Sequence, residues 1–161
     1  MKMDRILGVD PGIGITGFCV LDTNYRRTKL HAYGTIRPKT KDTTPKKLQY
    51  LFDEMNIIIN KFSPNIFAIE DAFYSKNIKS AMTLGHARGA LILSASKSGL
   101  KIYEFAPRKV KLSVAGSGSA SKEQISYMVS KILNLDEIPK PADISDAIAV
   151  GLCFINQNKF L

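Results

Sequence analysis

The sequence predicts an α/β protein with a five-stranded mixed sheet that has helices on both faces. Two observations predict it. Three short apolar runs joined by short links open the chain, and later apolar runs alternate with segments of helical periodicity. A meander followed by alternating units is typical of a mixed sheet covered on both sides. The length of 161 residues suits one domain, residues 1–161, with a sizeable core.

The first three strands are expected to form an antiparallel meander. RILGVD (5–10) is an apolar run that ends in the turn PGIG. The second strand is ITGFCVLD (15–22), and the third is KLHAYGTIRP (29–38), in which Gly34 is a candidate for a β-bulge. The short links between the runs favour pairing of consecutive strands.

Helices then alternate with two further strands. In TTPKKLQYLFDEMNIIINKF the apolar residues fall on one helical face, with Thr44 as N-cap and Pro45 as the first helical residue. The strands are NIFAIED (65–71) and KIYEFAP (101–107), and a helix over 77–98 separates them.

Three shorter helical segments complete the chain. The first lies in APRKVKLSVAG and leads into GSGSAS (116–121), which is expected to be a flexible loop. Ser121 and Gln124 have the spacing of a capping box for the next helix. The last helix begins near Pro141.

Composition limits the classes of partner. A formal net charge of +9 and a pI near 9.6 favour a polyanion, either nucleic acid or an anionic membrane. Membrane binding is the weaker alternative, because no apolar run approaches the roughly 20 residues of a spanning helix. The start MKMDRILGVD has no signal-peptide pattern. Cys19 and Cys153 lie in apolar contexts without a CxxC motif, so we expect reduced thiols and a cytoplasmic protein.

Four acidic residues stand where folding can gather them. Asp10 and Glu70 end the first and fourth strands, and Asp143 and Asp146 lie in the first turn of the last helix. If those strands are parallel neighbours, the first two carboxylates emerge at one sheet edge. Clustered oxygen ligands select Mg²⁺ or Mn²⁺ rather than zinc. Two such ions about 3.5–4 Å apart can activate a water and stabilise the leaving oxygen of a phosphodiester.

Each acidic residue also has a purely structural interpretation. Asp10 before Pro-Gly can be a turn former, and Glu70 and the neighbouring Asp71 can be a solvated strand end. Asp143 and Asp146 can simply favour the positive end of the helix dipole. Taken singly, these interpretations are as good as metal binding. The order of the elements around all four residues favours the metal site.

Five segments together resemble a known family: ILGVDPGIGITGF, FAIEDAFYSKN, LGHARG, VKLSVAGSGSASKEQ and ADISDAIAV. They resemble the RuvC-type Holliday junction resolvases, crossover junction endodeoxyribonucleases of homologous recombination and repair with a ribonuclease-H-like fold. The segments follow the family's order and spacing over nearly the whole chain. The resemblance implies paired symmetric nicks in a four-way DNA junction, each leaving a 5′-phosphate and a 3′-hydroxyl.

The same resemblance implies roles for single residues. Asp10, Glu70, Asp143 and Asp146 match the family's four metal-binding carboxylates, which implies two Mg²⁺ ions per site with Mn²⁺ as a substitute. The third of these positions is a histidine in some members. Here it is Asp143, so every expected ligand is an oxygen.

The resemblance also implies DNA contacts. Phe73 matches an aromatic residue that stacks on bases near the junction centre, although it can instead be a core residue, and Tyr74 can share the stacking role. Lys111 and Lys122 match basic residues near the scissile phosphate. Further charge from Arg108 and Lys109 lies close by in the sequence.

A stripe of small residues, Ala81, Gly85 and Gly89, lies in the second predicted helix. Two glycines destabilise a helix by about 1 kcal/mol each relative to alanine, so we expect another backbone to approach closely, within the chain or across a dimer. The resemblance implies a homodimer through this region and a branch-migration motor as partner. For His86, polar packing or an interface contact is favoured over metal ligation.

Three other functions remain as alternatives. An actin-like or sugar-kinase ATPase also opens with an Asp-Gly phosphate loop, but it needs a second phosphate loop and a longer, duplicated chain. A ribonuclease-H-like nuclease for ribosomal RNA precursors is disfavoured by EDAFYSKN and the basic GSGSAS region. A junction-binding module without catalysis is disfavoured because all four acids are present.

Overall fold

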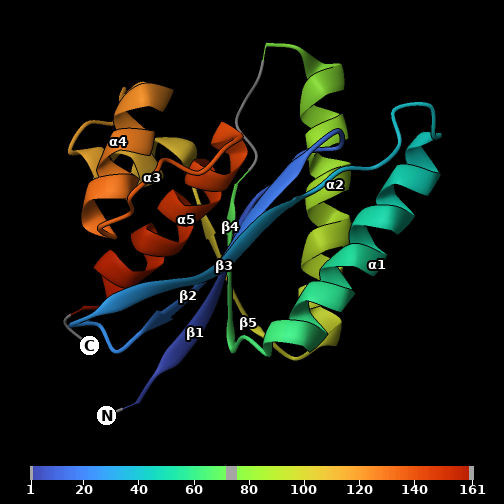
Figure 1. The fold of residues 1–161 in the computed structure, drawn as a ribbon. Coiled ribbons are helices and arrows are strands. Elements are labelled where there is room, and N and C mark those ends of the chain that lie inside the picture. Colours follow the sequence, from blue (N-terminus) through green and yellow to red (C-terminus); the bar gives the residue numbers. More distant parts are fainter. Residues whose placement is uncertain (1, 72–75, 160–161) are drawn as a thin grey trace.

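The computed structural model describes residues 2–71 and 76–159. They form one five-stranded sheet in the order β3-β2-β1-β4-β5, with helices on both faces (Figure 1). The strands are β1 (Asp4–Asp10), β2 (Thr16–Thr23), β3 (Thr28–Ile36), β4 (Ile66–Glu70) and β5 (Lys101–Phe105). The helices are α1 (Thr44–Phe62), α2 (Ile78–Lys97), α3 (Pro107–Ala115), α4 (Lys122–Ile132) and α5 (Ala142–Asn158).

The sheet is mixed, as the order of apolar runs predicts. β1, β2 and β3 form the antiparallel meander, whereas β4 pairs parallel with both β1 and β5. Strand β1 therefore occupies the centre and joins the antiparallel half of the sheet to the parallel half.

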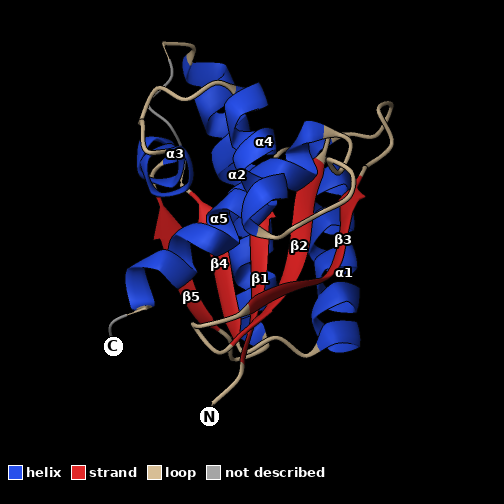
Figure 2. Cartoon of the chain, turned by 60° about the vertical axis from the view of Figure 1, so that its left-hand side comes forward, coloured by secondary structure: helices blue, strands red, loops and turns tan. Residues whose placement is uncertain are grey.

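Alternate residues of the central strands face two separate hydrophobic clusters. Leu7 and Val9 of β1 pack with α1 and α2 on one face, whereas Ile6 packs with α3, α4 and α5 on the other. Figure 2 shows the sheet between these two helical layers. The predicted covering of both faces is confirmed.

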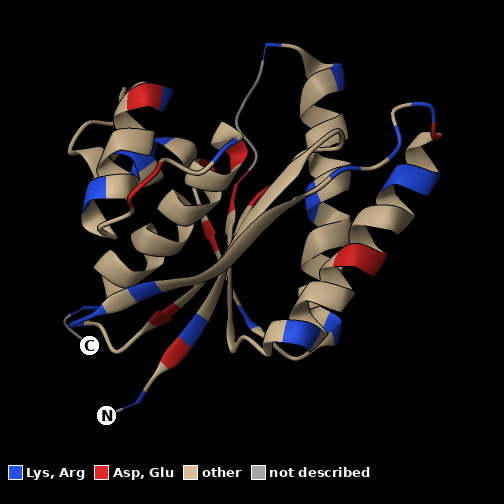
Figure 3. Ribbon diagram, viewed as in Figure 1, with Lys and Arg blue, Asp and Glu red and all other residues tan. Residues whose placement is uncertain are grey.

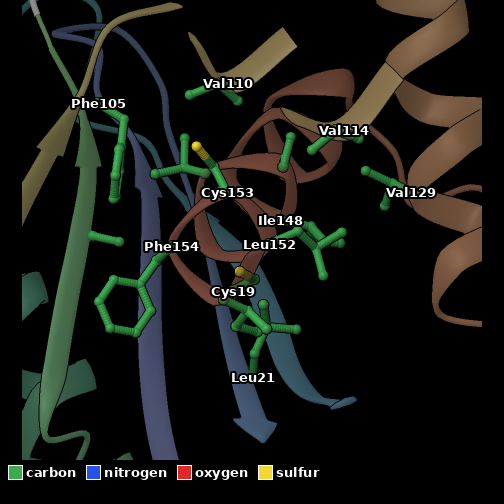
Figure 4. Packing of buried hydrophobic residues seen from close by; sticks show 14 of the residues in the cluster. Cys19, Leu21, Phe105, Val110, Val114, Val129, Ile148, Leu152, Cys153 and Phe154 are labelled. Carbon is green, nitrogen blue, oxygen red and sulfur yellow. The ribbon is translucent and has the colours of Figure 1, made fainter. Parts of the chain in front are cut away.

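Helix α5 is the most deeply buried helix element of the second layer. From Ile144 to Ile155 every residue except Asp146 is buried, because α5 lies between the sheet and the pair α3 and α4. Figure 4 shows Ile148, Leu152 and Cys153 of this helix packed among side chains from the neighbouring elements. The start of α5 is thus held in a fixed place relative to the strand ends.

The predicted position of the β-bulge is wrong. The bulge lies between Val20 and Leu21, whose partners are Ala32 and Leu30, and not at Gly34. Gly34 instead makes room for the Phe18 ring, since a Cβ there would lie 2.9 Å from that ring.

The first helix begins one residue earlier than predicted. Thr43 is its N-cap, and Thr44 is already helical. Thr43 makes no side-chain capping bond, so the side chains at this end do not distinguish the two threonines.

Other boundaries agree with the sequence. Asn77 and Ser98 cap α2, and Pro141 precedes α5. Ser121 and Gln124 form the predicted capping box, with the Ser121 Oγ accepting from the Gln124 backbone N–H at 3.1 Å. Among the described helices, none has the length and apolar character needed to cross a bilayer.

Candidate active site

Asp10 and Glu70 lie side by side at the carboxyl ends of two neighbouring parallel strands. The parallel pairing of β1 and β4 runs through Val9 and Ile69, and each acid is the next residue of its strand. The turn after Asp10 is closed by Thr16, whose buried hydroxyl donates to the Gly12 carbonyl at 2.8 Å. The predicted convergence of these two strand ends is confirmed.

Two glycines let the start of α5 pack directly on the sheet beside these acids. A Cβ on Gly17 would lie 2.1 Å from the Asp143 carbonyl oxygen, and one on Gly8 would lie 2.5 Å from that of Ala147. Gly17 is the register partner of Asp10 on β2. The close approach therefore brings Asp143 and Asp146 to the edge where Asp10 ends its strand. Sequence reasoning missed both glycines, although glycine inside a strand is a known sign of close backbone approach.

All four acids and two lysines line the same cavity, which has a volume of about 470 Å³. The lysines are Lys111 of α3 and Lys122 at the start of α4. The remaining lining residues are mostly apolar or glycine: Pro11, Gly12, Gly14, Ile15, Pro107, Val110, Ile125 and Ala149. Figure 3 shows acidic segments at the upper ends of the central strands and the start of α5, with basic segments of the α3–α4 layer alongside.

The carboxylates interact unfavourably without a cation. Burial, and then the charges of Glu70, Asp146 and Asp143, raise the pKa of Asp10 to about 8. Burial and Asp146 raise the pKa of Glu70 to about 7, although Lys111, a hydrogen bond with Asp10 and Lys122 oppose the shift. Burial also raises the pKa of Asp146. A bound cation would relieve each of these shifts.

The donor set fits a hard divalent ion. All four groups are carboxylates, and neither thiol nor imidazole lines the cavity. Within residues 2–71 and 76–159, however, no three acidic, His or Cys groups are close enough together to hold an ion as they stand. The four acids nevertheless line one cavity, and the charges of Glu70, Asp146 and Asp143 all act on Asp10.

Other residues named from the sequence lie elsewhere. Arg108 is exposed and packs against Gly118 in the α3–α4 loop, where a Cβ would meet its Cγ at 2.6 Å. The Lys109 ammonium lies over the Phe105 ring, 5.9 Å from its centroid. Neither residue lines the cavity.

Phe73 and Tyr74 lie outside the described residues. His86 is an exposed residue of α2, the helix layer on the opposite face from α5, and it does not line the cavity.

Comparison with known proteins agrees with this arrangement. The family model described as "Crossover junction endodeoxyribonuclease RuvC" matches residues 6–154. Curated proteins of that name from Finegoldia magna and Halothermothrix orenii are 44% and 42% identical to this chain, over 97% and 94% of it and 95% and 92% of their own lengths.

Solved structures share this fold. T. thermophilus RuvC in complex with Holliday junction substrate matches with a TM-score of 0.90 and 26% identity, covering 98% of this chain and 96% of that one. The yeast mitochondrial Holliday junction resolvase Ydc2 shares the fold, with a TM-score of 0.70 at 14% identity, covering 95% of this chain and 78% of its own. This chain belongs to the family of crossover junction endodeoxyribonucleases RuvC.

Proposed function

We propose that this protein resolves four-way Holliday junctions in DNA by paired symmetric nicks, each leaving a 5′-phosphate and a 3′-hydroxyl, in recombination and repair. One observation carries the proposal: four carboxylates from β1, β4 and α5 line a single cavity together with two lysines. Acids can hold metal while lysines bind the phosphate backbone, which is the division of labour that phosphodiester hydrolysis needs. The 161 residues act as one domain, whose two hydrophobic clusters cover the two faces of one sheet.

The four acids would hold divalent ions, Mg²⁺ or Mn²⁺, with two ions per site. Such ions supply activation of the attacking water and stabilisation of the leaving oxygen. Asp10 and Glu70 present carboxylates from neighbouring strand ends, and Asp143 and Asp146 present theirs from the first turns of α5.

Lys111 and Lys122 would bind the scissile phosphate. Both line the cavity, and Lys122 opens α4, where free backbone N–H groups add to its charge. Arg108 and Lys109 lie outside the cavity and would contact the DNA backbone further along one arm of the junction. Phe73 would stack on bases near the junction centre, with Tyr74 beside it in sequence, each stack being worth about 1–3 kcal/mol.

The protein would act as a homodimer through α2. Ile78, Met82, Gly85, Gly89 and Leu93 follow one another at helical spacing along α2, and all five are exposed. No other part of the described chain comes within 4 Å of a Cβ built on either glycine, which favours a second copy over an intramolecular neighbour. A twofold dimer suits the near-twofold symmetry of a four-way junction.

A branch-migration motor would deliver the junction, and the reaction belongs in the cytoplasm. The net charge of +9 suits a nucleic-acid partner.

The test uses an immobile four-way junction, a linear duplex of matching sequence and a structured RNA, each with Mg²⁺ or with EDTA. We expect nicks only in the junction and only with Mg²⁺, at symmetric positions that DNA ligase can reseal. Cleavage of the RNA alone would favour a nuclease for RNA precursors. Junction binding without cleavage would favour a binding module, and ATP turnover without cleavage would overturn the proposal.

A further inference from the structure

We propose that Arg88 of α2 is a positioning residue for Glu70, an inference that rests on the proposed function of the four acids. The Arg88 Nε donates a hydrogen bond of 3.0 Å to the backbone carbonyl of Glu70. The Arg88 side chain is only 11% exposed, so the bond is shielded from water. Glu70 thus presents its side chain to the cavity while its backbone is fixed from α2.

The other contacts of Arg88 fix the same strand end. Its Nη2 lies 3.3 Å from an Asp71 carboxylate oxygen and also pairs with the carboxylate of Glu104 on β5. The Asp71 backbone N–H donates to the Phe105 carbonyl at 2.8 Å. One guanidinium therefore ties the carboxyl end of β4 to α2 and to β5, directly behind Glu70.

The geometry asks for arginine specifically. A guanidinium presents several N–H donors in a fixed plane, so it can bind a carbonyl and two carboxylates at once, whereas an ammonium on a flexible stem holds one direction at a time. If Arg88 only balanced the charges of the half-exposed Asp71 and Glu104, it would not need to bind a carbonyl. The bond to the Glu70 carbonyl is the contact that links Arg88 to the active site.

Loss of Arg88 should lower the cleavage rate and raise the Mg²⁺ concentration that cleavage requires. Removal of a residue that orients a metal ligand without touching the metal typically changes metal affinity or activity by about 10- to 100-fold. For Arg88→Met we expect a single-turnover cleavage rate about 10- to 100-fold lower and a higher Mg²⁺ concentration for half-maximal rate, with junction affinity in EDTA close to wild type. Arg88→Lys should recover only part of the loss.

The experiment compares these two variants with Glu104→Gln, which keeps the bond to Glu70, and with Lys97→Met, which removes a positive charge from the exposed end of the same helix. Lys97→Met should keep the wild-type Mg²⁺ midpoint, and Glu104→Gln should shift it less than Arg88→Met does. Thermal unfolding of each protein separates a loss of fold from a loss of positioning. If Arg88→Met does not fold, the Mg²⁺ midpoint of Arg88→Lys decides.

Two results would overturn the inference, and they differ. Wild-type rate and Mg²⁺ midpoint in the folded Arg88 variants would overturn the role of Arg88 alone. A Glu70→Gln variant run in parallel should lose cleavage. If it cleaves like wild type, the proposed carboxylate site is wrong, and the role of Arg88 falls with it.

Discussion

Gly17 of β2 lies directly beneath the backbone carbonyl of Asp143, so closely that a Cβ on Gly17 would come within 2.1 Å of that oxygen. Real Cβ atoms do not approach an oxygen to this distance, so only glycine permits the contact. Because Gly17 also pairs with Asp10, it connects the strand that presents the first acid with the helix that presents the last two. A residue without a side chain thus sets the geometry of the candidate metal site.

Gly17→Ala should therefore lift the start of α5 from the sheet. Overpacking of a tight contact destabilises a protein by about 1–3 kcal/mol, which thermal or denaturant unfolding measures. The cleavage rate should fall even where the variant stays folded, because Asp143 and Asp146 move with the helix. Gly14→Ala is the control, since nothing lies within 4 Å of a Cβ there, and it should unfold like wild type. Equal stability of both variants would contradict the contact.

Asp146→Asn should abolish nicking while junction binding survives. The amide keeps the size of the side chain but loses the charge that a divalent ion needs. Burial raises the pKa of Asp146, so removal of this charge should also raise the unfolding temperature in EDTA. Gel-shift and single-turnover assays separate binding from cleavage. Asp136→Asn makes the same chemical change at an exposed position and should have no effect. A normal rate for Asp146→Asn in Mg²⁺ would refute the metal assignment.

The stability of the metal-free protein should fall as pH rises. The pKa of Asp10 is raised to about 8 and that of Glu70 to about 7, from ordinary values near 4. Between those limits the folded state binds more protons than the unfolded state, so stability is greatest at low pH and is lost as pH passes through 7 and 8. Asp4 and Asp22, whose pKa values are lowered, have the opposite effect, but only as the pH falls toward about 4 and below.

Denaturant unfolding in EDTA from about pH 5 to pH 9 measures this slope. Mg²⁺ should stabilise the protein more at the alkaline end, because it replaces the protons. The double variant Asp10→Asn/Glu70→Gln should show a much flatter profile. A wild-type profile that rises toward pH 9 would mean that burial and neighbouring charges do not raise the pKa values of Asp10 and Glu70.

The sequence predicted the fold wherever a local pattern determined the outcome. The apolar runs that end at Asp10 and Glu70 located both strand ends, and the spacing of Ser121 and Gln124 located a helix start. It could not predict the contact between Gly17 and Asp143, because tertiary packing brings together residues far apart in the chain.

Other misses have a similar origin. The bulge opposite Val20 and Leu21 depends on pairing across two strands, and Gly34 was a misleading local signal because its space is filled by Phe18. Arg88 was part of the quoted LGHARG segment, but nothing in the sequence shows that its side chain reaches the carbonyl of Glu70.

Lys122→Met should weaken phosphate binding and raise the pKa values of the neighbouring carboxylates. Loss of one phosphate contact lowers the slope of log affinity against log salt by about 0.9. Lys122 lowers the pKa of Asp10, Glu70 and Asp146, so its removal should shift the pH profile of cleavage to higher pH. Lys131→Met is the control, because that ammonium lies over the Tyr127 ring of the same helix and outside the cavity. Identical salt slopes for both variants would remove Lys122 from the DNA interface.

Met82→Asp should convert a dimer into monomers and uncouple the two nicks. Met82 is 58% exposed on the α2 surface formed by Ile78, Met82, Gly85, Gly89 and Leu93, and a charge in a closely packed twofold interface would be repeated on both copies. Sedimentation measures the dimer, and a cruciform plasmid distinguishes paired from single nicks. Ile132→Asp, an exposed apolar position on α4 in the opposite helical layer, should leave both unchanged. A Met82→Asp protein that still sediments as a dimer would place the interface elsewhere, because an aspartate pair facing itself across a dry contact is unfavourable unless another group neutralises it.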